Sequence, residues 1–127
     1  MNFYEQENNK TVLKTREIIR ELPEFCNEFF LDLNQNTLPK TRMGYAYDLR
    51  VFFNFLVTEN KEFLGRDIKS LTLDDLQKIK VVDINQFMDY LAYYVSDEDS
   101  QLYSNGENGK ARKLAAVRKL FKYFYRT

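Results

Sequence analysis

Apolar side chains recur at helical spacing through most of this chain, and this periodicity limits its fold more than any other feature. Between residues 39 and 58, an apolar stripe follows a period of about 3.6 residues. It consists of Tyr45, Leu49, Phe52, Phe53 and Leu56. The chain has only two prolines and four glycines, and few segments alternate apolar and polar residues. The pattern predicts an all-α protein, a bundle of roughly four to five helices with no competing sheet.

Prolines and capping residues indicate where these helices begin. Pro23 and Pro39 stand at positions typical of the first helical residue. Thr37, Thr72 and Asp83 are the expected caps of the helices that follow them. We expect residues 1–9 to fray and the polar, acidic loop 96–106 to be mobile. The expected helices span residues 10–22, 23–33, 39–58, 84–95 and 108–125, and a helical turn is expected at residues 73–79.

Length and composition restrict the class of protein. With 127 residues, 44% of them hydrophobic and 16% aromatic, the chain can bury one core but not two ordinary ones. The single cysteine, Cys26, is expected to be a buried small hydrophobe, and the lack of histidine removes the common zinc sites. We expect no metal, cofactor, membrane span or signal peptide. The sequence therefore predicts one cytoplasmic domain.

Charge is distributed unevenly along the chain. Nineteen basic and nineteen acidic residues balance overall, yet residues 108–127 hold seven of the basic residues and no acid. Net charge is −3 for residues 1–39, −3 for 40–99 and +6 for 100–127. Such asymmetry is typical of a surface that binds a polyanion. The alternative is that these side chains only solvate a helix face and favour its negative C-terminal end.

The last predicted helix has two different faces. One is apolar and expected to pack on the bundle: Leu114, Val117, Leu120, Phe121 and Phe124. The other places basic and aromatic residues around a floor of Ala115 and Ala116: Arg112, Lys119, Lys122, Tyr123 and Arg126. Lys110 and Lys113 are expected to cover the edge of the bundle with their stems. Because a helix about 10–12 Å across fits the major groove of B-DNA, nucleic acid is the natural partner of this second face.

Three motifs in sequence order carry a family resemblance. Residues 41–56 read TRMGYAYDLRVFFNFL, residues 68–76 and 83–91 read IKSLTLDDL and DINQFMDYL, and residues 111–123 read ARKLAAVRKLFKY. The first resembles the T-x-x-x-Y-x-x-D-L-x-x-F-x-x-F/W-L pattern of the N-terminal, core-binding domain of tyrosine recombinases, the phage-integrase and Xer-type enzymes. The others are similar to its connection into the third helix and to its last helix. The match covers residues 23–126 and departs from the pattern at Leu38, where a capping residue is usual.

The resemblance implies a SAM-like bundle that forms one jaw of a clamp around duplex DNA. Its second and fourth family helices would face the major groove of a recombination half-site. It divides the chain into an N-terminal extension with a short helix, residues 1–22, and a core-binding domain, residues 23–127. The catalytic domain, with its tyrosine nucleophile, is expected to follow Thr127 in a full-length tyrosine recombinase. The expected partners are double-stranded DNA and other recombinase protomers on DNA, and the isolated domain is expected to be a monomer.

The predicted DNA contacts fall into two groups. Those expected to bind phosphates are Lys40, Arg50, Lys119, Lys122 and Arg126. Those expected to reach base edges are Thr41, Arg42, Tyr47 and Arg112, because arginine can bind guanine O6 and N7 together. Arg118 could serve either purpose. Thr41 could instead only support its helical turn, and Asp48 is expected to hydrogen-bond within the bundle.

Catalysis by this chain is not expected. Nine tyrosines are present, but a phenol with a pKa of about 10 needs a positioned base, and the chain has no histidine. The sequence also lacks a glycine-rich phosphate loop and a metal-ligand cluster. The main alternative is a helical protein-interaction module without DNA affinity. Such a module would contact its partner through residues 10–22 or through the acidic loop.

Overall fold

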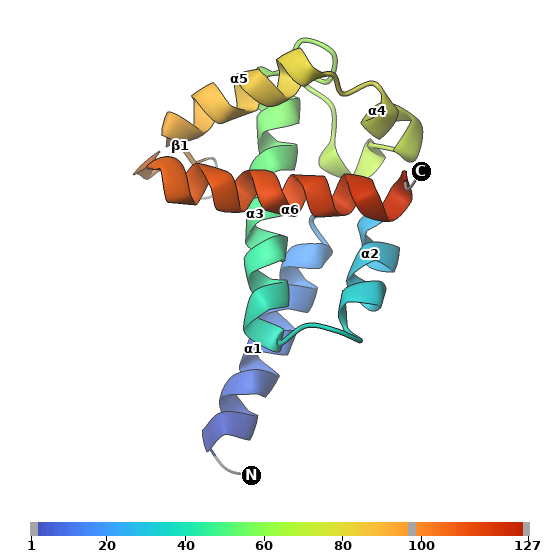
Figure 1. Ribbon diagram of the computed structural model, residues 1–127, viewed down its shortest axis with the longest axis vertical. Helices are drawn as coiled ribbons and strands as arrows, with labels where there is room; N and C mark the ends of the chain where they lie inside the picture. The colour runs from blue at the N-terminus through green and yellow to red at the C-terminus, as the bar shows by residue number, and fades with distance from the viewer. Residues whose placement is uncertain (1–2, 97–98, 126–127) are drawn as a thin grey trace.

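Six α-helices, one 3-10 turn and a short hairpin make up residues 3–96 and 99–125, which the computed structural model describes (Figure 1). The elements are α1 (Phe3–Ile19), α2 (Cys26–Leu33), α3 (Pro39–Glu59), η1 (Ile68–Ser70), α4 (Leu73–Gln77), α5 (Val81–Ala92), β1 (Tyr93–Val95), β2 (Leu102–Ser104) and α6 (Glu107–Phe124). The predicted all-α class is confirmed.

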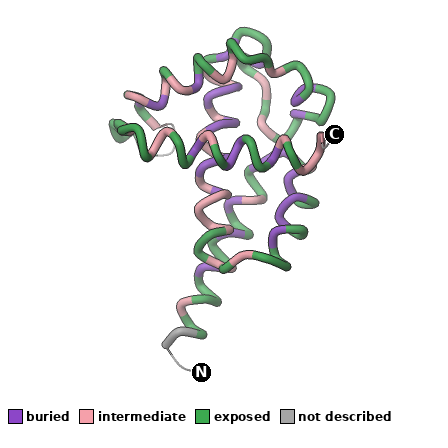
Figure 2. The backbone as a smooth tube through the Cα atoms, viewed as in Figure 1, coloured by how far each residue is buried: buried purple, intermediate pink, exposed green. Residues whose placement is uncertain are grey.

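The long helix α3 is the axis of the bundle. α1 packs along it, α6 crosses it, and α5 contacts both α3 and α6. Leu49, Phe52 and Phe53 of α3 are fully buried, and each contributes about 1.5–3 kcal/mol by leaving water. Figure 2 shows buried positions along α2, α3 and the part of α6 that crosses α3. The apolar stripe predicted from the sequence therefore faces the core.

Aromatic rings join the helices across this core. Phe52 of α3 lies 5.1 Å from Phe87 of α5, and Phe25 lies 6.0 Å from Phe53 and 5.7 Å from Phe124 of α6, between ring centroids. All three pairs are edge-to-face, which the ring quadrupoles favour by about 0.5–1.5 kcal/mol beyond the buried area. The Phe25–Phe124 contact fixes α6 against the start of α2.

The N-terminal helix is longer than predicted. It starts at Phe3, so the expected fraying of residues 3–9 is wrong, while residues 1 and 2 lie outside the described residues. Ile18 and Leu22 are fully buried and belong to the same core as α3. The predicted boundary at residue 22 thus does not coincide with an edge of the core. The division into an extension and a DNA-binding domain stays a prediction.

Three predicted helix starts differ from the structure. Pro23 precedes a turn, in which the Cys26 amide donates to the Pro23 carbonyl at 3.0 Å, and α2 begins at Cys26. Thr37 does not cap α3; its hydroxyl donates to the Leu33 carbonyl at 2.6 Å, and Leu38 occupies the capping position. Asp83 lies inside α5, where its carboxylate accepts from the Lys80 amide at 2.8 Å. The buried Cys26 was predicted correctly.

A hairpin replaces the last three residues of the predicted helix 84–95 and part of the predicted loop 96–106, so the expectation of no sheet is wrong at this point. β1 and β2 are antiparallel, with Tyr94 opposite Tyr103 and Val95 opposite Leu102. The Tyr94 ring stacks on Tyr103 at 5.5 Å and on Tyr90 of α5 at 4.8 Å. Cross-strand aromatic pairs stabilise such a ladder, but strands of three residues are too short to show alternation in the sequence. Asp97 and Glu98, also in the predicted loop, lie outside the described residues.

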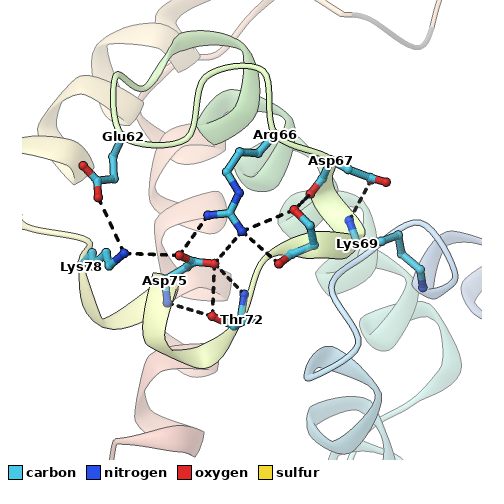
Figure 3. A network of polar contacts seen from close by, with 8 residues as sticks. Glu62, Arg66, Asp67, Lys69, Thr72, Asp75 and Lys78 are labelled. Atoms are coloured by element: carbon cyan, nitrogen blue, oxygen red, sulfur yellow. Dashed lines mark hydrogen bonds and ion pairs between the residues drawn. The ribbon is translucent and has the colours of Figure 1, made fainter.

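A polar network closes the connection between α3 and α5 (Figure 3). The Nη1 and Nη2 nitrogens of Arg66 donate to Oδ1 and Oδ2 of Asp75 at 3.1 and 3.0 Å. Asp75 also accepts from the Thr72 amide at 2.9 Å, and the Thr72 hydroxyl accepts from the Asp75 amide at 3.2 Å. Thr72 is therefore the cap of α4, as predicted. The hydrogen bonds from Arg66 are the main cause that lowers the pKa of Asp75 to about 2.

The Asp75 carboxylate is expected to stabilise the fold at neutral pH. Because its pKa falls from 3.8 to about 2 on folding, its contribution is complete above about pH 4 and is lost as the pH falls toward 2. Replacing Asp75→Asn should lower the free energy of unfolding at pH 7 by about 1–2 kcal/mol. Urea unfolding at neutral and acid pH measures this change. The matched control is Asp74→Asn at the exposed neighbour, and equal losses in the two variants would contradict the assignment.

Candidate nucleic-acid interface

The helix α6 meets the bundle through a narrow buried stripe. Val117, Leu120 and Ala116 are at most 1% exposed, whereas Leu114 and Phe121 are only partly buried. The buried side of α6 therefore includes Lys113 and Ala116, which the predicted apolar face did not include. Ala116 belongs to the core, so the predicted floor of two alanines is wrong, and only Ala115 is exposed.

A buried carboxylate accounts for the position of Lys113 on the buried side of α6. Asp48 of α3 is 3% exposed, and its Oδ1 lies 3.8 Å from Lys113 Nζ and 3.3 Å from Arg112 Nη2. Lys113 also donates to the Asn105 side-chain oxygen at 3.2 Å, and the Asn105 amide donates to the Leu91 carbonyl at 2.8 Å. Asp48 therefore bonds within the bundle, as predicted. The prediction that Lys113 only covers an edge is wrong, because its ammonium is buried against Asp48.

Burial and charge act in opposite directions on this cluster. Removal from water raises the pKa of Asp48, and the nearby Arg112 and Lys113 oppose that rise. Burial lowers the pKa of Lys113, and the Asp48 carboxylate opposes that change. A buried charge of either sign is costly without its partner. The cluster therefore ties α6 to α3 at one defined position.

The exposed side of α6 carries a basic ridge, which consists of Arg112, Lys119 and Lys122 with Ala115 between them. The Arg112 side chain is 68% exposed although it reaches Asp48, and Lys119 and Lys122 are exposed. Lys119 and Lys122 also line a pocket of about 720 Å³ together with Thr37, which precedes α3. The ridge therefore extends toward the start of α3, where Lys40 and Thr41 are exposed.

Two predicted contact residues of α3 are directed toward α1. Arg42 donates to the Thr37 carbonyl and lines a groove formed by α1 and α2. Arg50 pairs with Glu21 at 2.8 Å and lies over the Tyr47 ring at 5.1 Å from its centroid. Arg50 and Tyr47 nevertheless line a pocket that also contains Arg112. Arg42 bonds to Thr37, which lines the pocket of Lys119 and Lys122. The DNA roles assigned to these residues stay predictions.

The remaining predicted contacts lie elsewhere. Arg118 lines a groove on the other flank of α6, with Ile84 and Met88 of α5. Arg126 lies outside the described residues. The sequence reasoning missed the buried role of Lys113, although Lys113, Ala116, Val117 and Leu120 follow helical spacing. No signal in the sequence indicated Asn105.

A search of the curated proteins found a relative of this domain. Over 111 residues the chain is 33% identical to the tyrosine recombinase XerC of Caldanaerobacter subterraneus subsp. tengcongensis. The chain is therefore similar to a part of a tyrosine recombinase. The alignment covers 83% of the chain but only 29% of the relative, so the chain spans less than a third of that protein's length. No family model and no solved structure matches the chain.

The described residues present a charged surface that is suited to binding. Within residues 3–96 and 99–125, no cluster of three or more metal-ligating side chains was found. In the same part of the chain, no helix is long and apolar enough to cross a membrane. The helix α6 carries exposed guanidinium and ammonium groups, which can donate hydrogen bonds to phosphate oxygens and base edges.

Proposed function

We propose that this chain is the noncatalytic DNA-binding domain of a site-specific tyrosine recombinase or integrase, and that it binds duplex DNA at recombination half-sites. The observation that carries the proposal is the basic ridge of α6, whose backbone is fixed across α3 by Asp48 and Lys113. Because the helix is already held in place, binding phosphates has to order the basic side chains but not the backbone that carries them. The similarity to a tyrosine recombinase supports the same function.

In the proposed complex, α6 lies against the major groove. Lys119 and Lys122 neutralise phosphates, and Lys40 at the start of α3 contacts the same duplex. Arg112 is the candidate for a base edge, because it is exposed at the first half of α6 and guanidinium can bind guanine bidentately. Arg112 would then exchange its contact with Asp48 for one with DNA, and Lys113 would remain to neutralise the buried carboxylate.

The proposal assigns the breaking and rejoining of DNA to the rest of a longer recombinase. The SAM-like, core-binding identity of the bundle, contacts with other protomers on DNA and a cytoplasmic location belong to the same proposal. Integration, excision and chromosome-dimer resolution are all compatible with it. A domain of this kind contributes affinity and orientation, because it forms one of two linked binding units.

Titration of a fluorescent duplex with the 127-residue chain tests the proposal. Saturable binding that weakens with added salt is expected, because phosphate contacts release counterions from DNA. A protein-interaction module would instead leave the duplex free at every salt concentration. Absence of binding to duplexes at low salt would therefore contradict the proposed function.

A further inference from the structure

A groove between α1 and α2 has an apolar lining. Val12 and Ile19 of α1 face Phe30 and Leu31 of α2 across a space of about 420 Å³. Leu31 is 66% exposed although it lines the groove. An exposed leucine beside further apolar side chains is typical of a surface that another protein covers.

The groove is bordered by three arginines, Arg16, Arg20 and Arg42, and none of its lining residues is acidic. Arg16 and Arg20 are exposed, and no acidic side chain in the described part of the chain pairs with either of them. The nearby carboxylates do not line the groove: Glu17 lies on α1, and Glu21 lies in the turn that follows α1. The groove therefore combines apolar side chains with unneutralised positive charge.

This combination decides between two classes of occupant. A DNA backbone would satisfy the guanidinium groups but would leave its phosphates against Val12, Ile19 and Leu31. An amphipathic protein helix can instead place leucine-like side chains in the groove and carboxylates on the arginines, as helices do in other apolar grooves. Arginine is also well suited to bind carboxylates through two parallel hydrogen bonds.

We propose that the α1–α2 groove docks an acidic amphipathic segment of a partner protein. The segment inserts apolar side chains between α1 and α2, and its carboxylates pair with Arg16 and Arg20. The groove shares none of its lining residues with the pocket that Lys119 and Lys122 line. Docking of this segment does not depend on whether the chain binds DNA.

The probe is a synthetic helical peptide with leucines at i, i+3, i+4 and i+7 and glutamates beside them. One control peptide has the same composition in scrambled order, and a second has glutamine in place of each glutamate. Binding is measured by fluorescence anisotropy of the labelled peptide with the 127-residue chain. We expect the amphipathic acidic peptide to bind at least tenfold more tightly than either control. Equal binding of the three peptides, or no binding at millimolar protein, would overturn the proposal.

Paired charge reversals locate the site. Arg16→Glu with Arg20→Glu should weaken peptide binding at least tenfold, because both carboxylate partners are replaced by like charges. Lys10→Glu with Lys14→Glu makes the same change in net charge on exposed residues of α1 that do not line the groove. This control should change binding less than twofold. Equal effects of the two pairs would overturn the proposal, and so would a loss of duplex binding in Arg16→Glu/Arg20→Glu with peptide binding unchanged.

Discussion

Replacing Lys119→Glu together with Lys122→Glu is expected to weaken duplex binding about a hundredfold near 0.1 M salt. Each phosphate contact contributes about eightfold to affinity at that salt through counterion release, so two contacts contribute about sixtyfold. The introduced carboxylates add repulsion from the DNA backbone. Both lysines are exposed on the basic ridge, so the double variant should fold normally. Fluorescence anisotropy gives the affinity, and thermal unfolding checks the fold.

The matched control for this variant is Lys61→Glu with Lys80→Glu. These lysines line a shallow pocket with Asn60, just beyond the C-terminal end of α3, and both are exposed. The change in net charge is identical, but the site lies at the opposite end of α3 from Lys40. Affinity for the duplex should fall less than about threefold, because salt screens charges that lie far from the contact. If this control loses as much affinity as the ridge variant, the ridge is not the binding surface.

Replacing Asp48→Ala is expected to lower the free energy of unfolding by about 3–5 kcal/mol, which is a large part of the stability of a small domain. The substitution leaves the Lys113 ammonium, whose side chain is 9% exposed, without its carboxylate. It also frees Arg112 from its contact with α3. Urea unfolding monitored by circular dichroism measures the change. A loss below about 1 kcal/mol would contradict the account of how α6 is fixed.

A double variant distinguishes the cost of an unpaired buried charge from the cost of lost packing. Combining Asp48→Leu with Lys113→Met removes both buried charges and fills their space with apolar side chains. Replacement of a whole buried ion pair in this way is often neutral or stabilising, so the double variant should recover most of the stability that Asp48→Ala loses. Asp89→Ala, at an exposed aspartate of α5, is the control and should change stability by less than about 0.5 kcal/mol. A double variant as unstable as Asp48→Ala would contradict the ion-pair explanation.

The helices were predictable because their signal is local. The burial of Leu49, Phe52 and Phe53 follows from helical periodicity within α3, and the Thr72 cap follows from its position before Asp75. The hairpin was not predictable in the same way. Its stability comes from Tyr94 and Tyr103, which meet only after the chain has turned back on itself.

The candidate site was predictable only in part. Periodicity correctly indicated that Arg112, Lys119 and Lys122 are exposed on α6. The placement of Lys113 and Arg50 depends instead on tertiary partners, since Lys113 is buried by Asp48 and Arg50 is held by Glu21 of the turn after α1. Helical spacing predicts which residues share a face of a helix. It does not predict which neighbouring element contacts each side of that helix.

Equilibrium binding of the chain to duplex DNA across a salt series tests the central claim most directly. About five phosphate contacts are expected in the proposed complex, from the side chains predicted to bind phosphates: Lys40, Arg50, Lys119, Lys122 and Arg126. The logarithm of the affinity should then fall with the logarithm of salt concentration at a slope of about −4 to −5 between about 50 and 200 mM. A slope near zero, or no binding at about 50 mM salt, would contradict a DNA-binding role for this domain.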